Sequence, residues 1–249
     1  MEPKFKLPTE TVELPSKGLL YPESSPLSKG TIEMKYMTAK EEDILTNQNF
    51  ITNGTVIDKL LRSLIVTEGV DFNEILIGDK NAIMVAARIL SYGKDYKITV
   101  QEEDITVDLS KFDNKEIDES NYEKGQNSFK FNLPKTDNEV TFKLLNHGDE
   151  KAIEREIKGL KKINKNSSPE VTTRMKHILT SVNGMTEKKE IRDFVDNYFL
   201  AADARALRTE YTRVQPDINF IVDHIFEDGR EEEISVPIGL GFFWPDDVS

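Results

Sequence analysis

The sequence of 249 residues contains no cysteine. This absence excludes disulfide bonds, zinc sites built from thiolates and catalysis by a cysteine nucleophile. A chain without cysteine also fits a reducing compartment, so we expect a cytosolic protein.

Histidine is scarce: His147, His177 and His224 are the only ones, and they lie far apart in the sequence. A metal site needs converging His, Asp or Glu ligands, and none of the three shows a recognisable ligand spacing. The acidic runs 102–104 and 231–233 lack the alternating oxygens around a glycine turn that a calcium loop requires. We therefore expect no metal ion, and we interpret the histidines as structural or surface residues.

Long apolar runs and excess positive charge are also missing. The N-terminus lacks the apolar segment of a signal peptide, and the stretches LLRSLIV and NAIMVAARIL are too short to span a bilayer. The chain has 33 basic and 45 acidic residues, a formal net charge of −12. Such a charge disfavours nucleic acid and anionic membranes as partners. We expect neither nucleic-acid binding nor direct insertion into a membrane.

Motifs of catalysis and of nucleotide binding are absent from the sequence. The stretches SKGLL and GLGFF lack the glycine spacing of a P-loop or a dinucleotide fingerprint. There is no Gly-x-Ser-x-Gly, no His-Glu-x-x-His and no local Ser/His/Asp arrangement. We therefore predict a protein that is not an enzyme, has no cofactor and acts through interaction.

The first part of the chain contains clear signals for strands and capped helices. Five prolines in residues 1–30 predict an extended arm, in which TETVELP alternates like a strand at a sheet edge or against a neighbour. TIEMKYMT predicts a half-buried strand, and Thr38 with Glu41 forms a capping box. Helices are expected in TVIDKLLRSLIV and in GDKNAIMVAARILSYG, the latter with Asp79 as N-cap and Gly93 as its stop.

Three hairpins and a second set of helices are expected further along. Residues 96–108 and 219–236 predict hairpins with acidic tips, the latter turning at Asp228-Gly229, and a third hairpin turns at 134–138. The remaining helices are predicted in GDEKAIEREIKGLKKI, in PEVTTRMKHILTSV with Ser168 as N-cap and an end at Asn183-Gly184, in EKKEIRDFVDNYF and in AADARALRTEYTRV.

Together these elements predict an α+β fold of helical clusters and short antiparallel β-hairpins with an extended N-terminal arm. We divide the chain into four segments. They are the arm at 1–30, an α+β lobe at 31–112, a polar hairpin with a charged helix at 113–166, and a helical cluster with a C-terminal hairpin and aromatic tail at 167–249.

The aromatic tail and two other groups are candidates for binding a partner. Large aromatic side chains need burial, either by closing this chain's own core or by inserting into another subunit. Asp203, Arg205 and Arg208 form a solvated helix face or an internal ion pair, or they contact another subunit. The candidate partner-binding residues are Phe242, Phe243, Trp244, Leu19, Leu20, Tyr21, Arg205 and Arg208.

Three stretches carry a family resemblance: VELPSKGLLYP with GTIEMKYMTAKEEDILTN, then IGDKNAIMVAARILSYGKDYKITV, and VPIGLGFFWPD. In this order they resemble the baseplate hub family of T-even-type contractile-tailed bacteriophages. The resemblance does not cover the middle of the chain, about 113–166. Some tail proteins with similar hairpins carry paired cysteines for zinc, whereas the tip here is Gln101-Glu-Glu-Asp104 and lacks those ligands.

The resemblance implies a non-enzymatic role among other baseplate hub and tail proteins, with self-association as a further possibility. The chain is then a hub component in the virion tail, or an assembly factor that acts in the host cytoplasm and is absent from the finished particle. A different class remains open from the residues alone, namely a cell-wall hydrolase that uses carboxylates such as Glu150 or Asp203.

Overall fold

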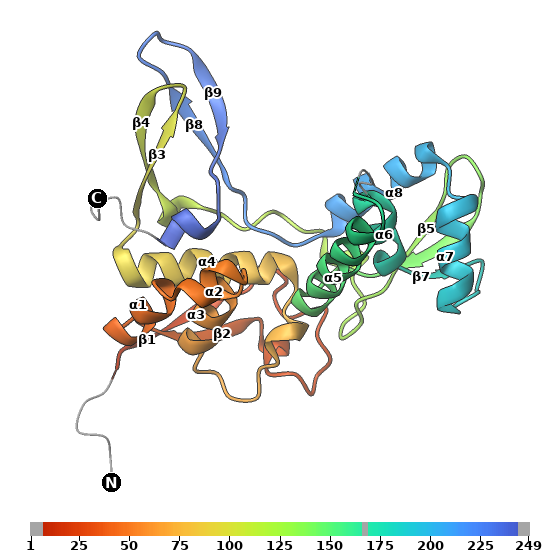
Figure 1. Ribbon diagram of the computed structural model, residues 1–249, viewed down its shortest axis with the longest axis horizontal. Helices are drawn as coiled ribbons and strands as arrows, with labels where there is room; N and C mark the ends of the chain where they lie inside the picture. The colour runs from red at the N-terminus through yellow and green to blue at the C-terminus, as the bar shows by residue number, and fades with distance from the viewer. Residues whose placement is uncertain (1–6, 166–168, 244–249) are drawn as a thin grey trace.

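The computed structural model describes residues 7–165 and 169–243, which form two lobes along the longest axis of the molecule (Figure 1). The first lobe contains β1 (Thr9–Glu13), β2 (Thr31–Lys35), α1 (Ala39–Leu45), α2 (Gln48–Thr52), α3 (Val56–Leu64), α4 (Ile77–Tyr92), β3 (Asp95–Val100), β4 (Glu103–Asp108), β8 (Ile221–Ile225) and β9 (Glu231–Ser235). The second lobe contains β5 (Phe129–Asn132), β6 (Glu139–Phe142), α5 (His147–Ile163), α6 (Glu170–Ile178), β7 (Leu179–Val182), α7 (Lys188–Asn197) and α8 (Ala201–Val214).

All the paired strands are antiparallel. The pairs β1–β2, β3–β4 and β8–β9 are two-stranded, and β5–β6–β7 is a three-stranded sheet. The three predicted hairpins form at the predicted places because their turn residues are local signals. The mixed α+β class is thereby confirmed.

The predicted extended arm is a strand only at β1, because turns and the 3-10 helix Pro26–Lys29 follow it, and the segment is held by its own lobe. Strand β1 pairs with β2 in register from Thr9↔Lys35 to Glu13↔Thr31, which is the sheet-edge alternative. Leu14, Leu20, Tyr21 and Leu27 are buried in the core. Residues 9–30 are therefore part of the first lobe and not an arm free to wrap a neighbour.

The beginnings of α1 and α4 illustrate one confirmed and one wrong prediction. Thr38 and Glu41 form the predicted capping box of α1, and Glu41 also accepts a hydrogen bond from Lys35 Nζ at 2.8 Å. Helix α4 starts three residues earlier than predicted, with Leu76 instead of Asp79 at the N-cap position, so Asp79 lies in its first turn. A carboxylate there still complements the helix dipole.

The helix predicted through residue 182 ends early. Helix α6 stops at Ile178, and Leu179–Val182 forms strand β7 beside β6. The sequence pattern missed this strand because Leu179 and Val182, which are buried, also suit a helix face. The proposed N-cap Ser168 lies outside the described residues.

Two antiparallel segments connect the lobes. Asn114 bridges Ile218, Lys115 N donates to Asp217 O at 2.8 Å, and Asn219 N donates to Asp113 O at 2.9 Å. The chain thus leaves the first lobe after β4, forms the second lobe and returns for β8–β9. The prediction grouped the last hairpin with the helices of 167–249, whereas it lies in the first lobe (Figure 1).

The junction between the lobes is closely packed. Ile77 N donates to Leu145 O at 3.2 Å, and His147 N donates to Ile75 O at 2.9 Å. A Cβ atom on Gly78 would lie only 1.8 Å from Pro216 O, so this contact requires glycine. The buried apolar residues of both lobes belong to one continuous cluster.

Candidate interaction surfaces

The hairpins β3–β4 and β8–β9 project together from the first lobe (Figure 1). We call residues 95–108 and 221–235 the prong. Strands β3, β4 and β9 each bury at least one side chain, and β8 alternates between exposed and half-buried side chains, as a two-faced hairpin requires. Ile98, Ile105 and Ile234 belong to the hydrophobic core.

Hydrogen bonds join the two hairpins near their tips. Gln101 Nε2 donates to Glu232 Oε2 at 3.2 Å, and Arg230 donates to Gln101 Oε1 at 3.2 Å. The backbone N–H of Glu227 donates to Glu103 Oε1, also at 3.2 Å. Because these bonds connect separate hairpins, we expect the prong to move as one unit.

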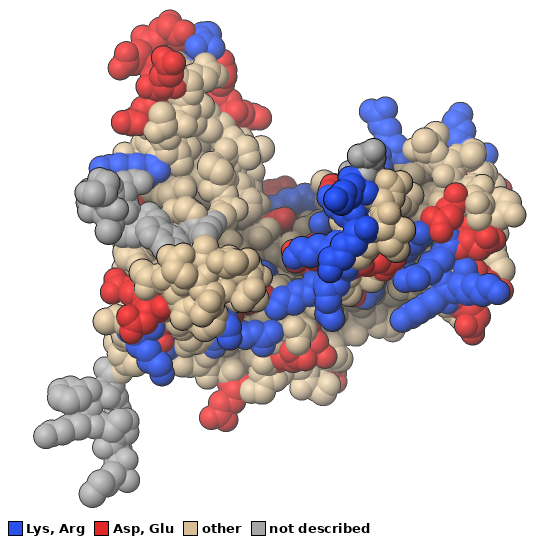
Figure 2. Space-filling model, viewed as in Figure 1, with Lys and Arg blue, Asp and Glu red and all other residues tan. Residues whose placement is uncertain are grey.

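The prong is strongly acidic. It contains eleven aspartates and glutamates and only two basic residues, Lys97 and Arg230. Figure 2 shows the acidic side chains gathered at its outer end. Such charge keeps exposed strand edges from pairing with one another and favours a cationic partner.

One face of β8 is apolar as well as exposed. Ile221 is 46% exposed and Ile225 is 65% exposed, with exposed Asp223 between them. Across the hairpin, Asp223 pairs with Glu233 and Ile225 with Glu231. We call Ile221, Asp223 and Ile225 the β8 strip.

The aromatic tail ends in the core of this chain. Phe242 and Phe243 are fully buried, and Phe242 lies edge-on to Tyr96 at 4.9 Å between ring centroids. Tyr96 is the second residue of β3, at the base of the prong. These two phenylalanines therefore close the core of this chain, the first of the two alternatives, and they are not exposed for a partner. Trp244 lies outside the described residues.

Leu20 and Tyr21, which the sequence made candidates for partner binding, are also buried in the first lobe, and Leu19 is half-buried. The Tyr21 hydroxyl donates to Asp79 at 2.6 Å and accepts from Leu76 N at 2.9 Å. Ser16 donates to the same carboxylate from its backbone N and its hydroxyl, at 2.9 and 2.7 Å.

This network ties the N-terminal segment to the start of α4. Burial raises the pKa of Asp79, while hydrogen bonds from Tyr21 and Ser16 oppose the rise. Burial and the nearby Asp79 raise the pKa of Tyr21 well above its usual value. The arrangement is structural: it satisfies buried polar groups and leaves none of these three side chains at the surface.

Asp203 does not lie on a solvated face and forms no ion pair with any residue in the described part of the chain, so both of those interpretations are wrong. It is fully buried and accepts hydrogen bonds from Lys135 N and Thr136 Oγ1, both at 2.8 Å. These donors belong to the turn between β5 and β6. Asp203 therefore fixes that hairpin turn to the start of α8, a long-range contact that no local pattern signals.

Arg205 and Arg208 lie exposed on α8, and neither guanidinium makes an ion pair with any residue that the structure describes. Arg208 borders a groove of about 250 Å³ between α6, α7 and α8. The groove is otherwise lined mainly by apolar side chains: Val171, Met175, Val195, Phe199 and Ala204. We call it the α8 groove. Sequence analysis identified the arginines but not the groove.

A second hollow, of about 340 Å³, lies between α5, α6 and α7 and is lined by several cations. Except for Lys188, its basic residues contact carboxylates of the same chain among the residues described. Lys176 pairs with Asp196 at 2.6 Å, Lys143 with Asp149 at 2.7 Å, and His177 with Glu156 at 3.0 Å.

The other histidines also contact carboxylates. His147 is buried, with Nε2 at 3.0 Å from Asp58 and Nδ1 at 3.1 Å from Lys80 Nζ. Because an ammonium group only donates, Nδ1 accepts and the proton lies on Nε2. His224 Nε2 lies 3.7 Å from Glu103. No group of three or more metal-ligating side chains is gathered among the residues described.

An extended acidic prong and an apolar groove are features of a protein that contacts other proteins. Residues 8–243 match a family described as T4 bacteriophage base plate protein. The chain therefore belongs to this family of T4-type phage baseplate proteins. Searches of curated proteins and of solved structures found no match.

Family membership gives the chain a structural or assembly role at the phage baseplate and implies contacts with other baseplate proteins. The family match confirms the resemblance at the level of the baseplate. Within the described part of the chain, no helix has the length and apolar character needed to cross a membrane.

Proposed function

We propose that the protein helps to build the central hub of the baseplate without bond chemistry of its own. It does so either as a hub component or as a dedicated assembly factor, and in both cases it works in the host cytoplasm while tails assemble. The observation that supports this proposal is the prong. A rigid, charged projection presents a large contact area without the cost of ordering a flexible segment on binding.

The three stretches that resemble hub proteins support the assignment. In the fold they come together: Ser16 and Tyr21 from the first stretch bind Asp79 from the second, and Phe242 from the third packs on Tyr96. The stretches thus form the framework that positions the prong.

The hydrolase alternative has little support from its two candidate carboxylates. Glu150 accepts two hydrogen bonds from Arg174, at 2.6 and 2.9 Å, and Asp203 is buried under the β5–β6 turn. A general acid needs a reacting group within hydrogen-bond reach. Release of soluble fragments from purified peptidoglycan by the chain alone, lost in Glu150→Gln, would favour the hydrolase.

The hub proposal is tested by infection with a phage that lacks this gene. We expect tails to stall before a complete baseplate forms, and the gene supplied in trans restores them. Normal baseplates in its absence would contradict the proposal. Mass spectrometry of purified wild-type particles then distinguishes the two roles. A hub component is retained in the particle, whereas a transient assembly factor is lost.

A further inference from the structure

We propose that the β8 strip of one copy docks in the α8 groove of a second copy, so that the protein associates with itself head to tail. This inference concerns self-association and does not depend on the hub assignment. It is carried by two exposed surfaces of the same chain, each apolar, one with a cationic border and the other with carboxylates.

The groove is built for side chains and not for a cofactor. Its volume of about 250 Å³ lies below the roughly 300–1,000 Å³ typical of small-molecule pockets. Its floor is apolar, and Arg208 is the one charged residue among the described residues that line it. Val171 of the lining is 49% exposed. Leu200, which lies between the lining residues Phe199 and Ala201, is also 49% exposed. An apolar anchor followed by a carboxylate is the occupant that this surface favours.

The β8 strip presents that pattern. Ile221, Asp223 and Ile225 alternate along one face of the strand, so the two isoleucines lie roughly 13 Å apart with the carboxylate between them. Across the hairpin, Glu231 faces Ile225 and Glu233 faces Asp223, and both add negative charge to this face. Ile225 in the groove brings the carboxylate of Asp223 toward the cationic side of α8, where Arg205 and Arg208 are exposed.

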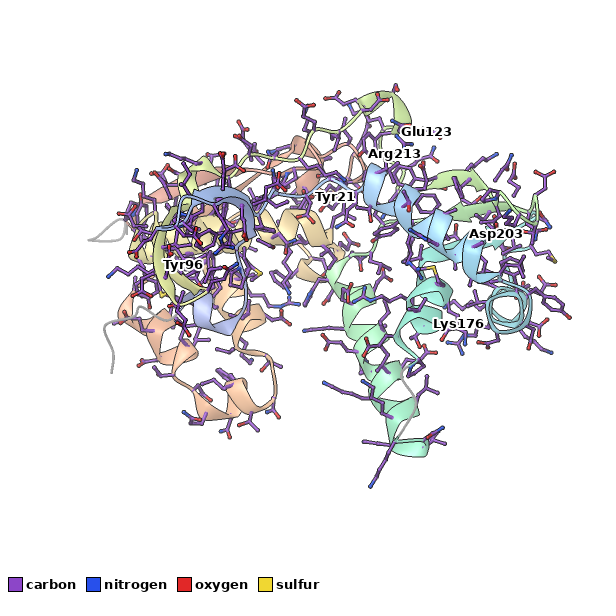
Figure 3. All side chains as sticks on the ribbon, turned by 90° about the horizontal axis from the view of Figure 1, so that it is seen from above. Tyr21, Tyr96, Glu123, Lys176, Asp203 and Arg213 are labelled. Atoms are coloured by element: carbon purple, nitrogen blue, oxygen red, sulfur yellow. The ribbon has the colours of Figure 1, made fainter. Side chains whose placement is uncertain are left out.

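The two surfaces cannot meet within one molecule. Figure 3 places Tyr96, at the base of the prong, and Asp203, beside the groove residue Ala204, toward opposite ends of the molecule. Contact therefore requires a second copy. Because each copy offers one strip and one groove, the contact closes into a two-fold dimer or a larger ring, or it extends as an open chain of subunits.

The test is sedimentation velocity of the full chain at concentrations up to roughly 100 µM, where a micromolar contact is populated. We expect species whose mass rises with concentration from the monomer to a dimer or a larger assembly. Ile225→Glu, Arg208→Glu and Asp223→Arg should each weaken association at least about tenfold, because each removes an anchor or opposes like charges. The matched control Arg155→Glu changes an exposed arginine of α5 and should associate like the wild type.

The decisive variant carries Arg208→Glu and Asp223→Arg together. Restored association in this double variant, with both single variants impaired, shows that the two side chains face each other. A wild-type chain that stays monomeric at these concentrations, or single variants that associate normally, would overturn the proposal. Circular dichroism of each variant establishes that it is folded. A negative result for self-association leaves the hub proposal untouched, because the phage experiment tests that proposal separately.

Discussion

Asp58, Asp79 and Asp203 are buried carboxylates that link distant parts of the chain, and their oxygens are satisfied in different ways. Asp79 receives hydroxyl and backbone donors from the N-terminal segment, and Asp203 receives those of a hairpin turn. Asp58 is surrounded by cations, with Lys151 Nζ at 2.6 Å and Lys80 Nζ at 3.2 Å. Burying a carboxylate is costly unless its oxygens are paired, so these contacts specify where the elements lie.

The Tyr21 hydroxyl links Leu76 N to Asp79, so its removal leaves a buried N–H without its partner. We expect Tyr21→Phe to lower the free energy of unfolding by about 1–3 kcal/mol in urea titrations. The control is Tyr36→Phe, whose hydroxyl bonds Glu10 at the surface at 3.1 Å. That variant should change stability little, and equal effects at the two sites would contradict the role of the network.

The surroundings of Asp58 make the stability of the fold depend on pH. Burial alone would raise its pKa, but hydrogen bonds from His147 and Lys151 and the charge of Lys80 hold the pKa of Asp58 well below its usual range. A folded-state pKa below the unfolded value of about 3.9 gives stability that is complete above that value and is lost as the pH falls below it.

Asp58→Asn should therefore cost stability, on the order of 2 kcal/mol or more, near neutral pH. The difference from the wild type should shrink by about 2 kcal/mol at roughly pH 2.5, measured by urea unfolding. Asp43→Asn, at an exposed site of α1, is the control. A difference independent of pH would show that the charge of Asp58 contributes nothing.

At the scale of elements, local signals were sufficient where the determinants are near in sequence. The capping box at Thr38 and the Asp228-Gly229 turn were both read correctly because cap and turn chemistry act over a few residues. Strand β7 and the position of Asp79 were missed. Their determinants are β6 and Tyr21, which are distant in sequence, and tertiary contacts override the local pattern there.

Two helical glycines should respond to alanine in opposite ways. Gly78→Ala places a methyl group against Pro216 O at the junction of the lobes and should destabilise the protein by more than about 2 kcal/mol. Gly159 in α5 has open space around it, so Gly159→Ala should stabilise by about 0.5–1 kcal/mol. Denaturant titrations measure both, and a neutral Gly78→Ala would mean that the junction is looser than described.

The tail at Phe242 and Phe243 should behave as core. Phe243→Ala removes a fully buried ring and is expected to cost about 3–5 kcal/mol of unfolding free energy. Ile225→Ala, at an exposed site on the prong, should cost less than about 0.5 kcal/mol. If instead Phe243→Ala leaves thermal stability unchanged and abolishes binding to a partner, the tail belongs to an interface.

At the scale of the whole molecule, the sequence predicted the hairpins and most helices but not their assembly. Nothing local indicates that β8–β9 returns to stand beside β3–β4, because the link consists of contacts such as Lys115 with Asp217 across a long insertion. The α8 groove was missed for the same reason, since three helices supply its walls. The charge of the prong, by contrast, is readable directly from the acidic runs.

The account rests on the claim that this baseplate protein works by contact between its prong and other baseplate proteins. The direct measurement is co-expression with the remaining hub proteins of the same phage, followed by affinity capture. Reversing two exposed tip charges, Glu102→Lys with Glu227→Lys, should abolish capture. The same reversal on the second lobe, Glu154→Lys with Glu190→Lys, should leave capture intact. Equal capture by both variants, or none by the wild-type chain, would contradict the claim.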